Sequence, residues 1–263
     1  MSMDWLYTVS GFFVGLIVGV TGVGGGSLMT PLLVLLFGVS PATAVGTDLL
    51  YASLTKMGGS WVHNKRGTVD WKIVKLLALG SVPMALLSLW VLHSLQVDEK
   101  HLKSLITSVL SVALILTSLS LYFKNQIQDW GRSKDGAVFE LHAHHLGGAT
   151  VLTGAVLGVL VTISSVGAGA LGMVVLLFLY PRHSTVKLVG SDIAHAVPLT
   201  LVAGLGHAAL GTVNFSLLGS LLLGSLPGIW VGSHVSAKIP ERVLRPILAT
   251  MLLIIGLKMA FYK

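Results

Sequence analysis

The sequence predicts an all-α membrane protein, a polytopic helical bundle built from two inverted repeats. Three observations lead to this prediction: the composition, a series of long apolar runs, and a match between the two halves of the chain. Of the 263 residues, 54% are hydrophobic and only 10% are charged, against about 25% charged in ordinary soluble domains. So few charges cannot cover the surface of a soluble globular enzyme, and we therefore expect a membrane protein.

Apolar runs account for most of the chain. Six of them are long enough to cross a bilayer as a helix, which takes about 20 residues. These runs are residues 41–61, 71–92, 102–123, 187–210, 215–235 and 244–262. Two of the six, 41–61 and 187–210, also carry internal polar residues. The runs predict six full membrane spans.

Two further apolar stretches are interrupted by small residues. Residues 3–39 contain the run GVGGG at 22–26 (the first break), and residues 146–180 contain SSVGAG at 164–169 (the second break). The short apolar pieces after each break cannot cross a hydrocarbon core of about 30 Å unaided. Each stretch therefore predicts a pair of half-helices joined inside the membrane. Each half of the chain then holds one glycine-broken helix pair and three full spans, which gives 8–10 membrane segments.

The two halves match each other at an offset of 143 residues, which becomes 144 after one inserted residue. The match covers the breaks, an Asp-containing motif and a Pro-containing motif: Gly24, Gly26 and Leu28 fall on Gly167, Gly169 and Leu171, VGTD at 45–48 falls on VGSD at 189–192, and GSVP at 80–83 falls on GSLP at 224–227. An odd number of crossings per half would invert the second half, as in many secondary transporters. We expect a first inverted repeat at 1–123, a linker at 124–145 and a second inverted repeat at 146–263.

Basic residues gather in the loops of one side of the predicted bundle. That side carries Lys65, Arg66, Lys72, Lys124, Arg132, Lys134, Arg182, Lys187, Lys238, Arg242 and Arg245, whereas the other carries Lys100, Lys103, Lys258 and Lys263. The positive-inside rule makes the first side cytoplasmic. We therefore predict a multi-pass inner-membrane protein with a cytoplasmic linker and both termini periplasmic.

Several classes of chemistry are excluded or not expected. The chain has no cysteine, so it has no disulfide and no thiolate site. Its net charge of +7 is spread between apolar runs, so no nucleic-acid partner is predicted. A tract at 140–145 with Glu140, His142, His144 and His145 could bind a metal, but such a tract in a loop is more often solvated. We predict no cofactor and no metal site.

The two breaks are the candidate anion site. A helix that restarts after a glycine break directs free N–H groups and its positive dipole end into the membrane centre, and nearby hydroxyls or a Lys would add donors. The candidate substrate-binding residues are Thr21, Gly24, Gly25, Gly26, Ser27, Lys56, Ser164, Ser165, Gly167 and Gly169. Close helix packing through small residues is the alternative explanation for the glycines.

Asp48 and Asp192 are the only charges inside predicted spans that recur in both halves. A charge at this depth is costly and usually faces a cavity or a partner, so both residues are candidate proton-coupling groups. His195 lies three residues after Asp192 on the same helical face and completes that set. Alternatives remain: both Asp residues could cap helix ends, Lys56 could pair with Asp48, attract substrate or extend to the headgroups, and His195 could contact a backbone carbonyl.

These residues resemble the TauE/SafE family of membrane transporters. The resemblance rests on GVGGGSL at 22–28 with the following Pro31, AVGTD at 44–48, and HNKRGTVDW at 63–71, and it covers nearly the whole chain outside the linker. It implies transport of a small, often sulfur-containing anion such as sulfite or a sulfonate. The second half departs from the pattern, with Ser164-Ser165 in place of a glycine pair and an uncharged loop at 207–214.

The expected function is therefore secondary transport of a small, sulfur-containing anion, with proton coupling. The expected partners are that anion and the lipid bilayer, and the sequence predicts no oligomeric state. A metal-cation or sodium-coupled carrier that uses the Asp pair is one alternative, and an intramembrane hydrolase is another. The absence of a Walker motif and of a His-Glu-x-x-His helix favours a transporter and not an enzyme.

Overall fold

The computed structural model describes residues 4–21, 26–94, 99–132, 136–235 and 241–261, and all regular secondary structure in these ranges is helical. The helices are α1 (Asp4–Thr21), α2 (Gly26–Phe37), α3 (Pro41–Lys65), α4 (Trp71–Ser94), α5 (Glu99–Tyr122), α6 (Lys124–Arg132), α7 (Gly136–Ser164), α8 (Ala170–Leu179), α9 (Thr185–Ala209), α10 (Phe215–Val235) and α11 (Glu241–Phe261). The predicted all-α class is confirmed.

Five of the described helices are long and apolar enough to cross a membrane. They are Trp71–Ser94, Lys100–Tyr122, His145–Ser164, Thr185–Ala209 and Phe215–Gly232, and α1, α2 and α8 contain shorter apolar segments. The expected spans at 41–61 and 244–262 also form helices, α3 and α11. Helix α3 is less apolar than the five because it contains Asp48 and Lys56, whereas the four charged residues of α11 lie close to its two ends.

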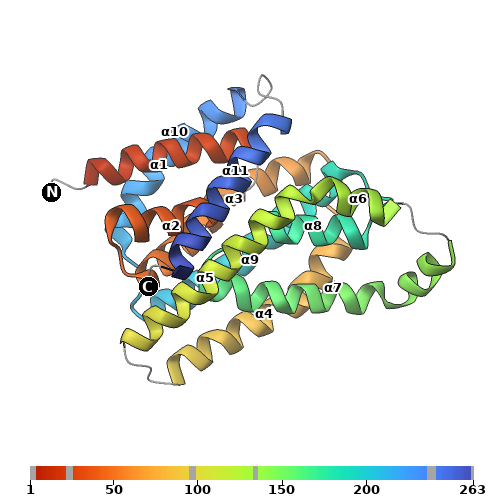
Figure 1. Cartoon of the computed structure of the whole chain (residues 1–263), viewed down its shortest axis with the longest axis horizontal. Helices are drawn as coiled ribbons and strands as arrows, with labels where there is room; N and C mark the ends of the chain where they lie inside the picture. Colours follow the sequence, from red (N-terminus) through yellow and green to blue (C-terminus); the bar gives the residue numbers. More distant parts are fainter. Residues whose placement is uncertain (1–3, 22–25, 95–98, 133–135, 236–240, 262–263) are drawn as a thin grey trace.

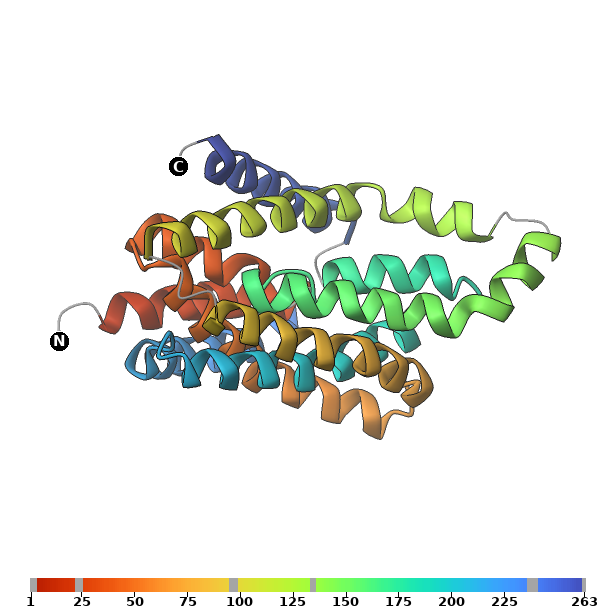
Figure 2. The same ribbon diagram turned by 90° about the horizontal axis from the view of Figure 1, so that it is seen from below.

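The most extensive contacts between helices join the first half of the chain to the second. In Figure 1, α1 lies along α10, α4 along α7, and α3 along α9, while α5 packs on α11. The first two contacts are equivalent under the sequence offset, because α1 matches α7 and α10 matches α4. The start of α1 and the end of α11 lie toward one end of the molecule and α6 toward the other (Figures 1 and 2).

Glycine allows the two outer helix pairs to approach closely. A Cβ added to Gly80 of α4 would collide with the carbonyl oxygen of Val151 in α7, and one added to Gly224 of α10 would collide with that of Thr8 in α1. Small residues at such crossings are typical of helices packed in membranes. Packing therefore explains the glycines of these outer helices, whereas the glycines of the second break have a different role.

Helices α3 and α9 pack antiparallel at the centre of the bundle. Ser53 Oγ donates to the Val197 carbonyl at 3.4 Å, Leu50 packs on Gly204, and Gly59 lies near Ile193. The paired numbers rise in one helix as they fall in the other, which defines the antiparallel direction. Asp48 and Asp192 each lie seven residues inside their helix. They therefore occupy opposite ends of this central pair, with Lys56 between them.

The loops after α3 and α9 make equivalent contacts. The Asp70 N–H donates to Ser191 Oγ of α9 at 2.8 Å, and the Asn214 N–H donates to Thr47 Oγ1 of α3 at 3.1 Å. Each loop thus attaches to the opposite central helix, next to its Asp residue. We call these contacts the Asp70 junction and the Asn214 junction.

Candidate functional site

The second break is an irregular turn between α7 and α8. Gly167 and Gly169 have φ of 121° and 122°, values that favour glycine, and Ser165 has φ of 58°. Ser164 Oγ donates to the Leu160 carbonyl at 2.6 Å and accepts from the Val166 N–H at 3.2 Å. The break therefore forms where the sequence predicted it, and the turn itself uses the Ser164 hydroxyl.

Asp48 connects α3 to both α2 and the second break. Its side chain is fully buried, and its Oδ2 accepts a hydrogen bond from Thr30 Oγ1 at 2.5 Å. The Ser165 hydroxyl lies near this carboxyl group. It makes no hydrogen bond with Asp48 Oδ1, because the geometry of the two atoms falls outside the hydrogen-bond range. The cap of α3 is Ser40, which accepts from the Thr43 N–H. The helix-cap explanation of Asp48 is therefore wrong.

Lys56 reaches the second break from the centre of α3. Its side chain is buried, and its Nζ donates to the Ala168 carbonyl oxygen at 2.8 Å. It therefore does not extend to the membrane surface. Asp48 and Asp192 both act on the ammonium electrostatically, but within the described ranges neither carboxylate lies within ion-pair distance of it. The expected Lys56–Asp48 pair is replaced by a bond to the broken backbone.

Asp192 lies against the first turn of α8. A Cβ added to Gly172 would collide with Asp192 Oδ1, and that oxygen is buried with no hydrogen-bond partner. Ser184, not Asp192, caps α9. His195 Nε2 is 2.8 Å from Ser81 Oγ of α4, and His195 Nδ1 has no partner in the described part of the chain. His195 thus pairs with a serine, and among the described residues its ring makes no hydrogen bond or ion pair with Asp192 and no hydrogen bond to a backbone carbonyl.

The second break and the first turn of α8 together therefore lie beside Asp48, Lys56 and Asp192, the buried Asp and Lys side chains of the described residues. Ser165 faces Asp48, the Ala168 carbonyl binds Lys56, and Gly172 borders Asp192. Buried polar atoms in folded proteins nearly always have partners, and an unpaired buried charge is costly. The Oδ1 atoms of both Asp residues, which have no hydrogen-bond partner among the described residues, are therefore suited to a proton or a ligand.

The first break contributes less to the described site. Gly24 and Gly25 lie outside the described residues, as do the side chains of Thr21 and Ser27. Helix α2 begins at Gly26, one residue before the predicted restart. Thr30, in its second turn, reaches Asp48, so α2 contributes to the site through a residue that the motif analysis did not select.

Sequence reasoning also missed Tyr51 and two serines. Tyr51 is fully buried and corresponds to His195 at the offset of 144. Its hydroxyl lies near Ser225, although the geometry falls outside the hydrogen-bond range. At the same offset, Ser225 corresponds to Ser81, which is the partner of His195. Applying the offset to every polar residue of the central helices would have found this second pair.

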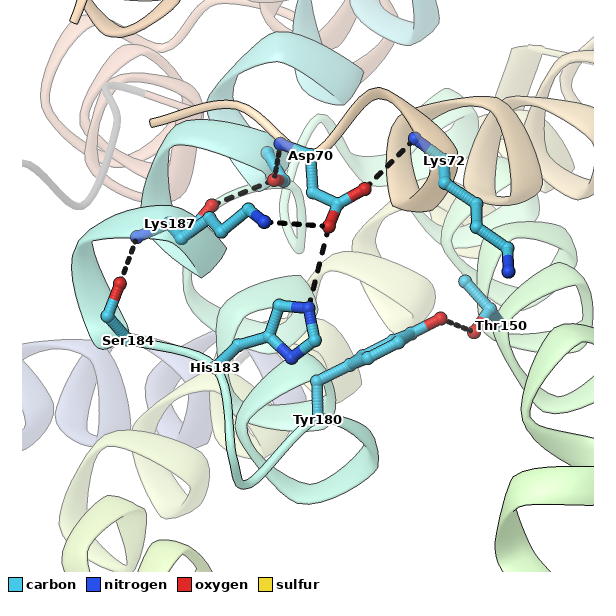
Figure 3. Close-up of polar contacts among 8 residues, drawn as sticks. Asp70, Lys72, Thr150, Tyr180, His183, Ser184 and Lys187 are labelled. Carbon is cyan, nitrogen blue, oxygen red and sulfur yellow. Dashed lines mark hydrogen bonds and ion pairs between the residues drawn. The ribbon is translucent and has the colours of Figure 1, made fainter. Parts of the chain in front are cut away.

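The Asp70 junction is charged. The Asp70 carboxylate lies 3.2 Å from Lys187 Nζ and 3.5 Å from His183 Nε2, and it accepts from the Lys72 N–H at 3.1 Å (Figure 3). Partial burial would raise the pKa of Asp70, but the Lys187 ammonium and the N–H donors of Lys72 and Ile73 outweigh this and hold it below its ordinary 3.8. The Asn214 junction has an amide in the same place.

A cavity of about 540 Å³ lies between α5, α6, α7 and α8. Its lining is apolar except for Ser120 and Thr153, whose hydroxyls donate to carbonyls of their own helices. Such a cavity suits hydrocarbon and offers nothing to an anion. It is therefore separate from the charged centre, although Leu157 and Leu171 of its lining neighbour the second break.

The chain matches the family model described as sulfite exporter TauE/SafE over residues 7–259. The chain belongs to the TauE/SafE family. It is 39% identical over 249 residues to "Probable membrane transporter protein YjnA" of Bacillus subtilis (strain 168), covering 95% of this chain and 96% of the relative. It is 27% identical over 257 residues to YdhB of the same organism, with 95% and 97% covered.

A third relative, a "Probable membrane transporter protein" of Xylella fastidiosa (strain Temecula1 / ATCC 700964), is 24% identical over 231 residues, with 88% of this chain and 84% of the relative covered. No solved structure matches the chain. The TauE/SafE family and these relatives are membrane transporters, not enzymes, so the hydrolase alternative is set aside. A multi-pass membrane protein is the class that both the helices and the family support.

Proposed function

We propose that this TauE/SafE protein is a secondary transporter that moves a small, sulfur-containing anion of the sulfite or sulfonate class across the inner membrane together with protons. The observation that carries the proposal is the convergence of Lys56, Asp48 and Asp192 on the second break and the first turn of α8. The substrate class rests on membership of a family described as sulfite exporters. The anion would bind near the Lys56 ammonium and the polar atoms of the break.

Charge balance makes protons part of the proposal. Two ionised carboxylates would repel an anion, so at least one of them is neutral when substrate is bound. Asp48 accepts a hydrogen bond from Thr30, which favours its ionised form, whereas Asp192 Oδ1 has no donor within the described chain. We therefore assign proton carriage to Asp192 and a structural role to Asp48. His195, with one free ring nitrogen, would pass the proton.

The architecture proposed for transport is the pair of inverted repeats, with both termini periplasmic and the linker cytoplasmic. The antiparallel packing of α3 on α9 supports it, since these two helices are equivalent in the repeat. Cysteines in place of Lys65 and Ala209, which are exposed and equivalent at the offset of 144, test it directly. The wild-type chain has no cysteine. An impermeant thiol reagent should label Lys65→Cys from the cytoplasmic side and Ala209→Cys from the periplasmic side. Labelling of both from one side would contradict the inversion.

Counterflow of labelled sulfite in proteoliposomes tests the function. Vesicles loaded with unlabelled sulfite should accumulate the label transiently, and Lys56→Met should abolish this accumulation while Thr200→Ala, at the equivalent position, should not. Accumulation of labelled sodium or a divalent metal in place of sulfite would favour the cation-carrier alternative. No counterflow of sulfite or of a short alkylsulfonate would refute the proposed substrate class.

A further inference from the structure

The Lys56 ammonium occupies a position with the chemistry of a cation site. It binds the carbonyl oxygen of Ala168, which lies between two glycines of positive φ in the unwound second break. Asp48 and Asp192 approach it from opposite ends of the central helix pair. Unwound carbonyls and buried carboxylates are the groups with which transporters with broken helices coordinate sodium. The Ala168 carbonyl oxygen therefore contacts the ammonium directly, the two carboxylates act on it at longer range, and a side chain of the protein supplies the cation.

We propose that Lys56 is a tethered cation that fills the cation position of the transport site, so that anion transport by this protein requires no sodium and takes protons as its coupling ion. This inference rests on the proposed function for its meaning in transport. The presence of a cation position rests on the structure alone. Among the described residues, the titratable groups that face the ammonium are Asp48, Asp192 and His195.

The count of charges gives the proton stoichiometry. With Lys56 and Asp48 charged and His195 neutral, the empty site carries one net negative charge when Asp192 is ionised. A bound monoanion adds a second negative charge unless Asp192 takes up a proton, which leaves the net charge of the site unchanged. Because an uncompensated charge at this depth is costly, one proton should accompany each monoanion. No sodium is needed in this balance.

Only the first half of the chain has a lysine at this position. Thr200 occupies the position equivalent to Lys56, and its hydroxyl donates to the Ala196 carbonyl of its own helix at 2.8 Å. Thr200 therefore supplies no charge, and within the described residues its hydroxyl bonds to its own helix and not to the second break. It gives a matched control, because Thr200→Ala removes a buried polar group at the equivalent place without opening a cation position.

Thermal unfolding of the purified protein with added methylammonium tests the inference without any transport substrate. In Lys56→Ala, methylammonium should occupy the vacated position and raise Tm by about 5 °C at saturation, and sodium should produce a smaller rise. Wild type and Thr200→Ala should show no shift with either ion. A sodium-dependent rise in wild type, or no rise in Lys56→Ala with either ion, would overturn the inference.

Lys56→Gln covers the case in which Lys56→Ala does not fold. It keeps a donor for the Ala168 carbonyl and removes the charge, so its Tm should rise with sodium, and the absence of a rise would count against the inference. Sulfite flux separates this inference from the proposed function. Ion-induced stabilisation of Lys56→Ala without sulfite flux in wild type would refute only the proposed function. Sulfite flux in wild type that needs sodium would refute only the tethered cation.

Discussion

Asp48 and Asp192 occupy equivalent positions in the two halves, yet their surroundings differ. Thr30 of α2 donates to Asp48, whereas the position equivalent to Thr30 is Met173, which has no hydroxyl, and Asp192 lies against Gly172. Three residues further along each helix, Tyr51 in one half corresponds to His195 in the other. The same backbone position therefore holds a carboxylate with a hydroxyl donor in one half and, among the described residues, a carboxylate without a hydrogen-bond donor to its buried Oδ1 in the other.

The loop contacts beside the two Asp residues show that the scaffold itself is duplicated. Ser191 and Thr47 accept backbone N–H bonds from Asp70 and Asn214 in the same way. The halves thus share the contacts that fix the central helices and differ in the side chains that hold charge. A duplicated frame can in this way give its two halves separate roles, one structural and one in proton transfer.

The contact between Gly172 and Asp192 offers the strongest test of this difference. Gly172→Ala places a Cβ against Asp192 Oδ1 and must displace the carboxylate, so we expect sulfite flux to fall by at least about tenfold because misplaced groups lose rate steeply. Gly219→Ala is the control, since nothing lies within 4 Å of its added Cβ. Wild-type flux in Gly172→Ala would show that the position of Asp192 is irrelevant.

Removal of the donor to Asp48 should have an intermediate effect. Thr30→Val leaves a buried carboxylate oxygen without its hydrogen bond, which costs about 1–3 kcal/mol and lowers Tm by about 2–4 °C per kcal/mol. Thr200→Val is the control, because among the described residues that hydroxyl bonds to carbonyls of its own helix alone. Equal Tm values for the two variants would contradict the proposal that Thr30 stabilises Asp48.

The Asp70 junction should give the smallest effect. Asp70→Asn makes it resemble the Asn214 junction, and loss of a partly exposed ion pair costs about 1 kcal/mol or less. Since Lys187 helps hold the pKa of Asp70 below 3.8, the contribution is complete above that pH and is lost as pH falls through the lower pKa of the folded state. Tm measured against pH should therefore differ between wild type and variant at neutral pH and converge in acid. A constant difference at all pH values would argue against the ion pair.

Sequence reasoning located the helices and the second break because both depend on local patterns, namely the length of apolar runs and the placement of glycine. It also selected Asp48, Lys56 and Asp192, since a charge in an apolar run stands out. It could not find the Lys56–Ala168 or Thr30–Asp48 bonds, because these depend on how distant helices pack. The repeat offset already identified Tyr51 as the equivalent of His195. The helix-cap alternative failed because the caps, Ser40 and Ser184, each lie eight residues before the Asp residue of their helix.

The dependence of sulfite flux on pH in Asp48→Asn and Asp192→Asn tests the central claim most directly. For wild type, flux on the alkaline side should fall by up to about tenfold per pH unit, since one proton moves with each anion. Asp192→Asn should bind sulfite and show flux independent of pH, whereas Asp48→Asn should lose stability or binding and keep the pH dependence of its remaining flux. Unchanged pH dependence in Asp192→Asn would contradict the assignment of proton carriage to Asp192.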